Sequence, residues 1–453
     1  MSKTKPTVEQ LLAKAEKPSA DAMCLHPYYH GKLQVAPKCR IRDFNDFAIW
    51  YTPGVAAPCR DIAENPENIY LHTNKGNFVA VVSDGTRVLG LGNIGPHAGM
   101  PVMEGKSILF KYLGGVDAFP ICLNTSNAEE IIQAVKWLEP CFGGINLEDI
   151  EKPKCFHVLD RLRHEMDIPV WHDDQQGTAA ITLAGLINAL KVVDKRVEDA
   201  RIVMVGSGAA NIACFRIMVE YGFPPEHIIV VDSKGILGRH RSDLKGPGNR
   251  EKWHICQVSN RGRREGSTAD AMVRADAVIA LSKSGPGVIL PEWIQAMEKH
   301  AIVFACANPV PEIWPWEALE AGAEVVATGR SDFPNQVNNS LGFPGIFRGA
   351  LDVRARTITD EMCIAAAEEL ARCAEDKGLS TEYILPHMDE WEVFPREAAA
   401  VGMKAIEQGV AQVTMTREEL YEKAAGRIRQ ARQQAEALME CGNIASAEGV
   451  CEE

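Results

Sequence analysis

The stretch Val203-Met-Val-Gly206-Ser-Gly208-Ala-Ala-Asn211-Ile-Ala213 decides the fold, because two glycines follow a short apolar strand and precede a helical pattern. The first glycine permits a tight turn, the second lets the backbone approach a pyrophosphate, and the helix N-terminus offers amide donors. Asn211 replaces the third glycine of the usual motif, which implies either a wider helix–strand separation or a side-chain contact to the cofactor. The pattern predicts a dinucleotide-binding turn made by Gly206, Ser207, Gly208, Ala209, Ala210 and Asn211.

An acidic residue at the end of the next strand supports this interpretation. Asp232 stands 26 residues after Gly206, where a carboxylate can accept hydrogen bonds from an adenosine ribose. The segment Arg239–Arg264 that follows carries eight Lys or Arg residues. Contact with the 2′-phosphate of NADP and a solvated basic loop are both open interpretations of that segment.

Apolar strands alternate with helical segments on both sides of the turn. Strands separated by helices indicate crossovers and a mainly parallel sheet, and five of them from residue 201 onward describe a doubly wound domain. The expected strands are 77–85, 87–92, 116–126, 142–149, 168–171, 201–211, 227–235, 275–287, 301–312 and 323–329. We therefore expect an N-terminal α/β domain over 1–170, a Rossmann-like NAD(P)-binding domain over 171–415, and a helical C-terminal tail over 416–453.

Composition narrows the classes of ligand. The chain has 453 residues and 48 Lys and Arg against 61 Asp and Glu, a net charge of −13, so we expect no nucleic acid and no membrane partner. The 13 cysteines show no metal or disulfide spacing. The polar start and the lack of a long apolar run lead us to expect a cytoplasmic protein.

Acidic residues end two strands of the N-terminal half. Glu148 and Asp149 follow one strand, and Asp173 and Asp174 follow another. Neighbouring strand residues face opposite ways, so Glu148 and Asp149 converge only if their strand has already ended. Together with Asp174 they form a carboxylate set suited to Mg²⁺ or Mn²⁺, although acidic pairs at strand ends also serve as helix caps or surface groups.

Two further residues have possible acid or base roles. Tyr51 lies beside a rigid Pro-Gly turn, and Lys106 precedes an apolar helix where burial lowers the pKa of an amine. An ordinary domain-edge tyrosine and a surface lysine are the simpler alternatives, and spacing alone does not choose between them.

Taken together, these segments resemble the malic enzyme family, specifically its short bacterial and archaeal type. The resemblance covers about residues 25 to 410. The matching stretches are YTPGVA from Tyr51, SDGTRVLGLGNIGPHAGMPVMEGKSILFK from Ser83, GGVDAFPICLNT, INLEDIEKPKCF, IPVWHDDQQGTA, the GSGAAN turn, VVDSKG, ANPVPEI and NQVNNSLGFPGIFRGALD. The sequence departs from the family pattern at Trp50, His97, Trp171 and Asn211.

The resemblance assigns roles residue by residue. It implies that Glu148, Asp149 and Asp174 bind the metal, that Tyr51 and Lys106 are the acid/base pair, and that Asp173 holds the lysine. It further implies contacts to substrate or nicotinamide from Arg87, Asn308, Asn338 and Asn339, with the choice between the last two open.

The implied reaction is the metal-dependent oxidative decarboxylation of malate to pyruvate and CO₂ with reduction of NAD or NADP, with decarboxylation of oxaloacetate as a further expected activity. Lys106 would act as a neutral base with a lowered pKa. Asp173 raises the pKa of Lys106, so this requires that the lowering effect of burial be larger. The resemblance also implies a homodimer or higher homo-oligomer, with Tyr51 reaching a neighbouring subunit. A malolactic conversion of malate to lactate and a catalytically silent nucleotide-binding protein are the alternatives.

Overall fold

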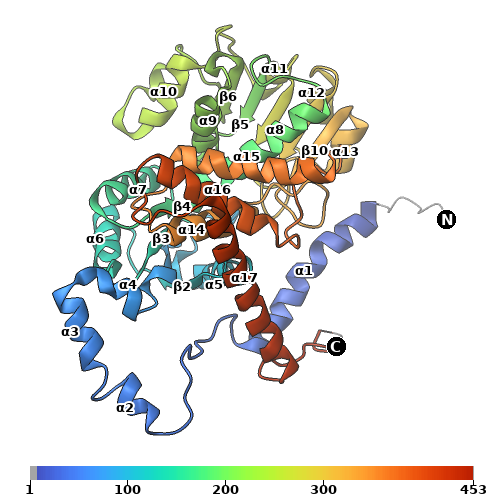
Figure 1. The fold of residues 1–453 in the computed structure, drawn as a ribbon. Coiled ribbons are helices and arrows are strands. Elements are labelled where there is room, and N and C mark those ends of the chain that lie inside the picture. Colours follow the sequence, from blue (N-terminus) through green and yellow to red (C-terminus); the bar gives the residue numbers. More distant parts are fainter. Residues whose placement is uncertain (1–7, 452–453) are drawn as a thin grey trace.

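The computed structural model describes residues 8–451 and contains two mainly parallel sheets with helices packed around them (Figure 1). The N-terminal sheet has the strand order β2-β1-β3-β4 and is parallel throughout. Its strands are β1 (Phe78–Ser83), β2 (Asp117–Cys122), β3 (Gly144–Leu147) and β4 (Val170–His172). The helices of this part are α4 (Ile69–His72), α5 (Gly95–Gly114), α6 (Ala128–Leu138) and α7 (Lys154–Glu165).

The second sheet has the order β10-β9-β8-β5-β6-β7. From β5 the chain runs outward first to β6 and then, through β8, in the other direction, so a topological switch point lies between β5 and β8. All pairs are parallel except β6 with β7. This arrangement confirms the doubly wound fold. The strands are β5 (Ile202–Val205), β6 (Ile228–Asp232), β7 (Gly235–Ile236), β8 (Ala277–Ala280), β9 (Ala301–Ala305) and β10 (Ala323–Thr328).

Helices complete both parts of the molecule. The apolar α8 (Thr178–Val192) is almost entirely buried and packs against α15 and α9, which explains the long apolar stretch after residue 178. The others are α9 (Ala209–Tyr221), α10 (Arg250–Val258), α11 (Thr268–Met272), α12 (Pro291–Gln295), α13 (Pro315–Glu320), α14 (Phe343–Asp352), α15 (Asp360–Lys377), α16 (Val393–Glu407) and α17 (Arg417–Glu440). None of the helices between residues 8 and 451 is long and apolar enough to cross a membrane.

Two local expectations were wrong. The stretch 87–92 is a turn closed by a bridge between Val88 and Gly92, not a strand. The helix that carries Lys106 begins at Gly95, because Pro96 occupies its first turn, where a missing N–H costs no hydrogen bond. Lys106 therefore lies in the middle of α5 and not at a helix start.

The C-terminal helix α17 packs on its own chain. It contacts α16 and α5, and its buried residues include Leu420, Ala424 and Ile428. The apolar face of α17 is thus covered within the chain.

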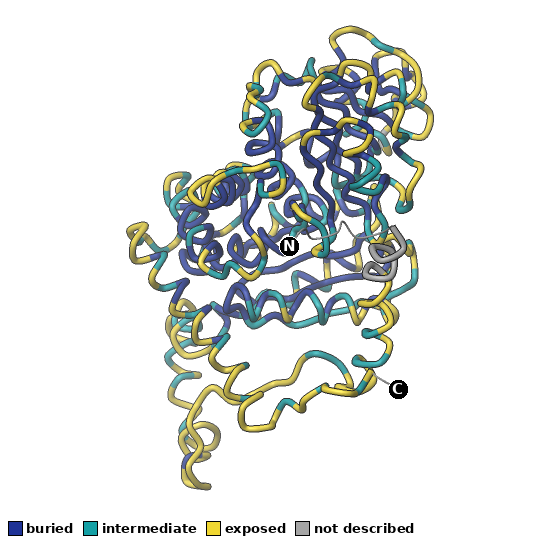
Figure 2. Tube along the Cα trace, turned by 90° about the vertical axis from the view of Figure 1, so that its right-hand side faces the viewer, coloured by how far each residue is buried: buried dark blue, intermediate teal, exposed yellow. Residues whose placement is uncertain are grey.

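The N-terminal segment forms an extended arm with α1 (Val8–Tyr29), α2 (Asp46–Trp50) and α3 (Ala56–Glu64). Figure 1 shows α2 and α3 projecting below the body, and Figure 2 shows most of this arm as exposed. Large apolar side chains lie exposed on it, not covered by any residue between 8 and 451, with Phe44 at 91% exposure and Val35 at 86%. An arm of this kind is expected to pack on another surface.

A carboxyl group is buried between α14 and α16. Glu397 is fully buried, and neither of its oxygens has a hydrogen-bond partner among the described residues. It lies so close to Gly345 that a Cβ there would collide with Glu397 Oε2. Burial, and then the charge of Glu369, raise the pKa of Glu397 well above its ordinary value of 4.5.

We expect Glu397 to make the protein less stable as the pH rises. The raised pKa means that the native state holds the proton more tightly than the unfolded chain. Its stabilising contribution is therefore complete below about pH 4.5 and is lost as the pH rises toward the native pKa. The loss amounts to at most about 1.4 kcal/mol for each pH unit in that window.

The Glu397→Gln variant keeps the shape of the protonated form and should remove this slope. Urea denaturation at a series of pH values measures it, with the exposed Glu407→Gln on the same helix as the matched control. Equal pH slopes for wild type and Glu397→Gln would contradict the assignment.

Candidate active site

The acidic residues gather at the carboxyl-terminal edge of the N-terminal sheet. β3 ends at Leu147 and β4 at His172, so Glu148, Asp149 and Asp173 all follow strand ends. Asp149 has a φ of 55°, a left-handed conformation that is uncommon outside glycine. This backbone turn breaks the strand alternation, so the consecutive side chains of Glu148 and Asp149 reach the same place.

The geometry fits a divalent cation. One ligand atom each from Glu148, Asp149 and Asp174 lie within 4.8 Å of one another. Asp149 Oδ2 is buried and has no hydrogen-bond partner among the described residues, whereas Asp174 Oδ2 accepts the Asp149 backbone N–H at 2.8 Å. An all-oxygen carboxylate set is the donor type that Mg²⁺ and Mn²⁺ prefer.

Without a cation these carboxylates repel one another. Burial first, and then the charge of Asp174, raise the pKa of Asp149 to about 8. Burial also raises the pKa of Glu148 well above its ordinary value, with Asp173 and Asp174 adding to the rise against the lowering effect of Lys106. A cluster that resists full ionisation by itself is stabilised by a bound positive charge.

Lys106 is buried beside this cluster. Its Nζ forms ion pairs with Asp173 and, at 3.1 Å, with Glu148, and lies 4.3 Å from the centre of the Phe343 ring. Burial lowers the pKa of Lys106, but the charges of Asp173 and Glu148 raise it more, so the net shift is upward. The expectation of a lowered pKa was therefore wrong, because two carboxylates face the amine.

Asp173 is held from two sides. Trp171 Nε1 donates a hydrogen bond to Asp173 Oδ1 at 3.3 Å, while Oδ2 pairs with Lys106. Gly177 lies directly beneath Oδ1, where a Cβ would collide with it. Burial raises the pKa of Asp173, and Lys106 opposes the rise.

Tyr51 is not part of this cluster within one chain. It follows α2 on the arm and is 70% exposed; its backbone N–H donates to the Phe47 carbonyl oxygen, and its carbonyl oxygen accepts the Val55 N–H, both inside the arm. Figure 1 shows α2 well away from α5, which carries Lys106.

Arg87 lies next to the acidic group. Its backbone N–H donates to the Asp149 carbonyl oxygen at 2.9 Å, and its guanidinium donates to the Leu89 carbonyl. The side chain is exposed and its charge acts on Asp149.

Three asparagines approach the same region from the second sheet. Asn308 packs against Gly90 and Gly329, so it joins the loop after Arg87 to the end of β10. The Asn338 amide is engaged, donating to the Gly329 carbonyl at 2.9 Å and accepting the Ser340 N–H at 3.0 Å. The Asn339 amide makes no hydrogen bond to the described residues, and its Cβ lies beside Gly177.

The predicted dinucleotide turn joins β5 to α9. Gly206 has a φ of 100°, and a Cβ there would come within 2.7 Å of the Leu281 carbonyl oxygen. The Asn211 side chain donates to the carbonyl oxygens of Val205 at 2.9 Å and Gly206 at 2.8 Å. Asn211 therefore stabilises the turn through its side-chain amide nitrogen, which is hydrogen-bonded to the backbone.

Asp232 at the end of β6 is already paired. Arg241 Nη1 and Nη2 lie 2.9 and 3.0 Å from its two oxygens, and the Lys234 N–H donates to Oδ1 at 2.9 Å. Lys252 Nζ lies 3.7 Å from Oδ2. Two members of the basic segment 239–264 are thus drawn to this carboxylate and are not solvated loop residues.

Sequence reasoning missed several supporting residues. Asn146 Nδ2 donates to Glu148 Oε2 at 2.8 Å, and Lys152 Nζ donates to the Ser207 carbonyl oxygen at 3.0 Å. Asn146 lies on β3 two residues before Glu148, and this closeness in the sequence was a usable signal. Lys152 contacts Ser207 and Phe343 contacts Lys106. Both contacts join segments far apart in the chain, so no local sequence pattern could predict them.

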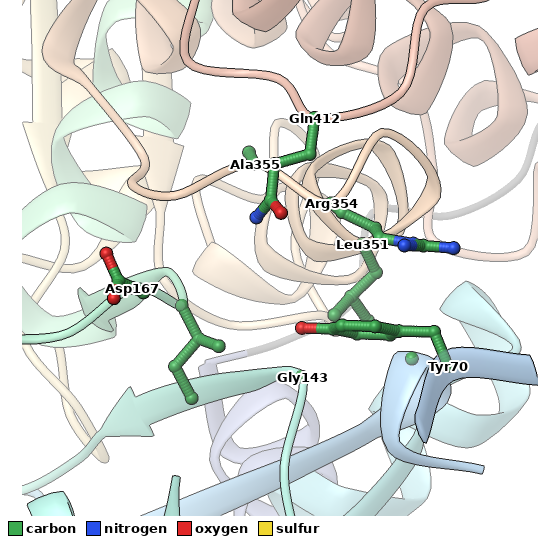
Figure 3. Close-up of a pocket in the computed structure, with 9 residues that line it drawn as sticks. Tyr70, Gly143, Asp167, Leu351, Arg354, Ala355 and Gln412 are labelled. Carbon is green, nitrogen blue, oxygen red and sulfur yellow. The ribbon is translucent and has the colours of Figure 1, made fainter. Parts of the chain in front are cut away.

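A small cavity elsewhere is not the substrate site (Figure 3). It lies between Tyr70, Gly143, Asp167, Arg354 and Gln412, and its volume of about 10 Å³ holds at most one water molecule. It contains none of the acidic residues described above.

Family models cover most of the chain. Residues 30–163 match the malic enzyme N-terminal domain, and residues 175–407 match the malic enzyme NAD-binding domain. The chain belongs to the malic enzyme family.

Individual relatives agree with this family. The bifunctional malic/malolactic enzyme of Bacillus subtilis is 50% identical over 403 residues, covering 89% of this chain and 97% of that protein. The NAD-dependent malic enzyme of Geobacillus stearothermophilus is 50% identical over 381 residues, covering 84% and 78%. The crystal structure of Entamoeba histolytica malic enzyme has a TM-score of 0.96 and 48% identity, covering 99% of this chain and 95% of that one.

We expect the carboxylate cluster to bind Mn²⁺ with a 1:1 stoichiometry. Asp174→Asn removes one charged ligand and should weaken Mn²⁺ binding by at least about tenfold, because one ligand charge is worth well over 1 kcal/mol in such a site. Isothermal titration calorimetry of the metal-stripped protein measures this without any need for activity. Glu151→Gln, an exposed carboxylate two residues after Asp149, is the matched control and should bind as wild type.

Proposed function

We propose that the protein catalyses the oxidative decarboxylation of malate to pyruvate and CO₂ with reduction of NAD(P)⁺. One observation carries the proposal: the buried Lys106–Asp173 pair stands beside a three-carboxylate group at a sheet edge, and Lys152 links that edge to the dinucleotide turn. Membership of the malic enzyme family supports the same reaction.

The roles of the bound groups follow from this placement. Glu148, Asp149 and Asp174 would hold the divalent cation, and the turn from Gly206 to Asn211 would hold the dinucleotide. When bound, the cation supplies a Lewis acid for the substrate oxygens and the dinucleotide supplies a hydride acceptor.

Lys106 and Asp173 move the substrate proton. Since Lys106 is favoured as the ammonium, it becomes a base only after Nζ passes a proton to Asp173 Oδ2, the oxygen with which it is paired. Burial raises the pKa of Asp173 and so makes this transfer less costly, because the neutral pair leaves no desolvated charge. The free amine then accepts the hydroxyl proton of malate.

Two further residues orient the substrate in this proposal. The exposed guanidinium of Arg87 suits a substrate carboxylate, which it can bind through two parallel hydrogen bonds. Of the two neighbouring asparagines, Asn339 is the better candidate for contact with substrate or nicotinamide, because the Asn338 side-chain amide is already hydrogen-bonded to the backbone of Gly329 and Ser340.

Product analysis tests the proposed reaction. Purified protein supplied with malate, Mn²⁺ and either cofactor should release pyruvate in equal amount to the NAD(P)H formed. Oxaloacetate should also be decarboxylated. No turnover with either cofactor would contradict the enzyme assignment and favour a silent nucleotide-binding protein.

A malolactic reaction is the second candidate, favoured by the name of the Bacillus subtilis relative. It differs in its product, since lactate would accumulate without net formation of NAD(P)H. The same assay separates the two reactions when lactate is measured beside pyruvate.

We propose that the protein is a homodimer in which Tyr51 serves the active site of the partner subunit. The arm carries exposed Phe44, Ile49 and Trp50 beside Tyr51, and none of these is covered by the described part of the chain. A second copy with the same exposed arm would bury these side chains and bring the tyrosine to Lys106 of the other subunit, where its hydroxyl can protonate the enol of pyruvate.

Two inactive variants should restore each other. Tyr51→Phe and Lys106→Ala should each lose most of the malate-oxidising activity, but heterodimers made by co-expression carry one intact site out of two and should recover about half of the wild-type rate. Steady-state kinetics of tag-purified heterodimers measures the recovery.

Tyr28→Phe, on α1, is the matched tyrosine control and should remain active. Heterodimers as inactive as their parents would show that Tyr51 acts within its own chain or not at all.

We propose that the adenosine site favours NADP over NAD. A carboxylate offers about four lone-pair positions, and Arg241 and the Lys234 N–H already take three of those on Asp232. Three positive charges, on Lys234, Arg241 and Lys252, face the two negative charges of Asp232 and Asp243. One positive charge is therefore in excess. Lys252 at the free edge of Asp232 suits a 2′-phosphate better than a ribose hydroxyl.

Loss of Lys252 should change the cofactor preference. Lys252→Ala should lower kcat/KM for NADP by about tenfold or more, the cost of one charge-assisted contact, and leave kcat/KM for NAD within about twofold. Lys245→Ala, whose ammonium lies over the Trp253 ring, is the control from the same segment. Equal losses with both cofactors would contradict a role in 2′-phosphate recognition.

A further inference from the structure

We propose that Cys24 and Cys451 form a site of reversible disulfide formation that joins the N-terminal helix to the C-terminal segment, with a low-molecular-weight disulfide as the oxidant. The proposal does not depend on the proposed reaction, because both cysteines lie outside the candidate active site.

The two ends of the chain are already fastened together. Tyr28 Oη donates to the Ser446 carbonyl oxygen and Tyr29 Oη to the Ala445 carbonyl oxygen, each at 2.8 Å. Figure 1 shows the end of α1 beside the segment that follows α17. These bonds hold the C-terminal segment along the last turns of α1.

The sulfur atoms lie over the same turn of α1. Cys24 Sγ donates to the carbonyl oxygen of Val450, the residue before Cys451, at 3.1 Å. Cys451 Sγ lies 3.9 Å from the carbonyl oxygen of Asp21, one helical turn before Cys24. Because a helical side chain covers the turn preceding its own Cα, the Cys24 sulfur lies over that same turn, and the two thiols meet.

The thiols also interact directly. A hydrogen bond with the Cys24 thiol is the largest cause of the raised pKa of Cys451, which is about 11. Cys451 is exposed and Cys24 is half-buried, so a small oxidant in solution can reach the pair.

Other cysteines lack this arrangement. Six cysteines are buried, and burial raises the pKa of each of them. They are Cys155, Cys214, Cys256, Cys306, Cys363 and Cys373. Cys441, just after α17, is also exposed, but its sulfur contacts the Leu438 carbonyl oxygen and the Asn443 side-chain amide and not α1. Cys441 is therefore a matched control for Cys451.

The chemistry balances with oxidised glutathione. One cysteine thiolate attacks a sulfur of oxidised glutathione, which forms a mixed disulfide and releases one glutathione thiolate. The second cysteine thiolate attacks the first protein sulfur and releases the second glutathione. Two protein thiols are oxidised, one disulfide is reduced, and the two protons from the cysteines pass to the released thiolates.

The test uses the full chain. Reduced protein is equilibrated with mixtures of oxidised and reduced glutathione, alkylated, and examined by mass spectrometry. We expect two of the 13 thiols to be lost together, and a tryptic peptide containing Cys24 to be cross-linked to the C-terminal peptide. The melting temperature should rise in the cross-linked protein and return after reduction, because a crosslink restricts the unfolded chain.

Variants show whether the pair is the one assigned. Cys441→Ser should keep the cross-link, whereas Cys24→Ser and Cys451→Ser should abolish both the cross-link and the rise in melting temperature. A cross-link from Cys24 to Cys441, or glutathione on both cysteines without a cross-link, would overturn the proposal. So would crossed light and heavy peptides from a mixture of unlabelled and ¹⁵N-labelled protein, since they would show a bond between copies.

Discussion

The buried ammonium of Lys106 is the interaction around which the N-terminal half is arranged. A buried charge is tolerated only when partners compensate for its lost hydration, and here Asp173 and Glu148 do so. Those carboxylates in turn repel Asp149 and Asp174, and the surplus of negative charge would favour a bound cation at the same place. The acid, base and metal-binding roles proposed for these residues therefore depend on one balance of charges at the edge of one sheet.

The sheet topology brings the two halves of the chemistry together. Both sheets have a switch point, and in each the carboxyl-terminal edge carries the candidate residues: the acidic residues on the first sheet and the glycine turn on the second. The contact of Lys152 with the Ser207 carbonyl and that of Asn308 with Gly90 hold these edges against each other. Residues that are distant in sequence are thus brought next to one another at these two edges.

The sequence allowed the type of fold and most of the strands to be predicted, because apolar runs ending in Gly, Asp or Asn are local signals. The turn at 87–92 was missed because its glycines, Gly90 and Gly92, suit several conformations, and the start of α5 was missed because Gly95 and Pro96 do so too; tertiary contacts choose among them. Sequence motifs predicted which residues are candidates for the site, but they did not predict the pKa shifts and ion pairs of those residues. The upward pKa shift of Lys106 depends first on Asp173 and then on Glu148, which lie far from it in the sequence, and the pairing of Asp232 depends on Arg241 folding back across a loop.

Asn211 shows what a departure from a motif does. Its amide ties together the carbonyl oxygens of the strand end and of the glycine turn, so the loop is shaped by the protein itself before any ligand arrives. The conformational entropy of that loop is then lost during folding and not during association with the dinucleotide. Affinity at this turn is accordingly a matter of how rigid the empty protein already is, as much as of the contacts made to the ligand.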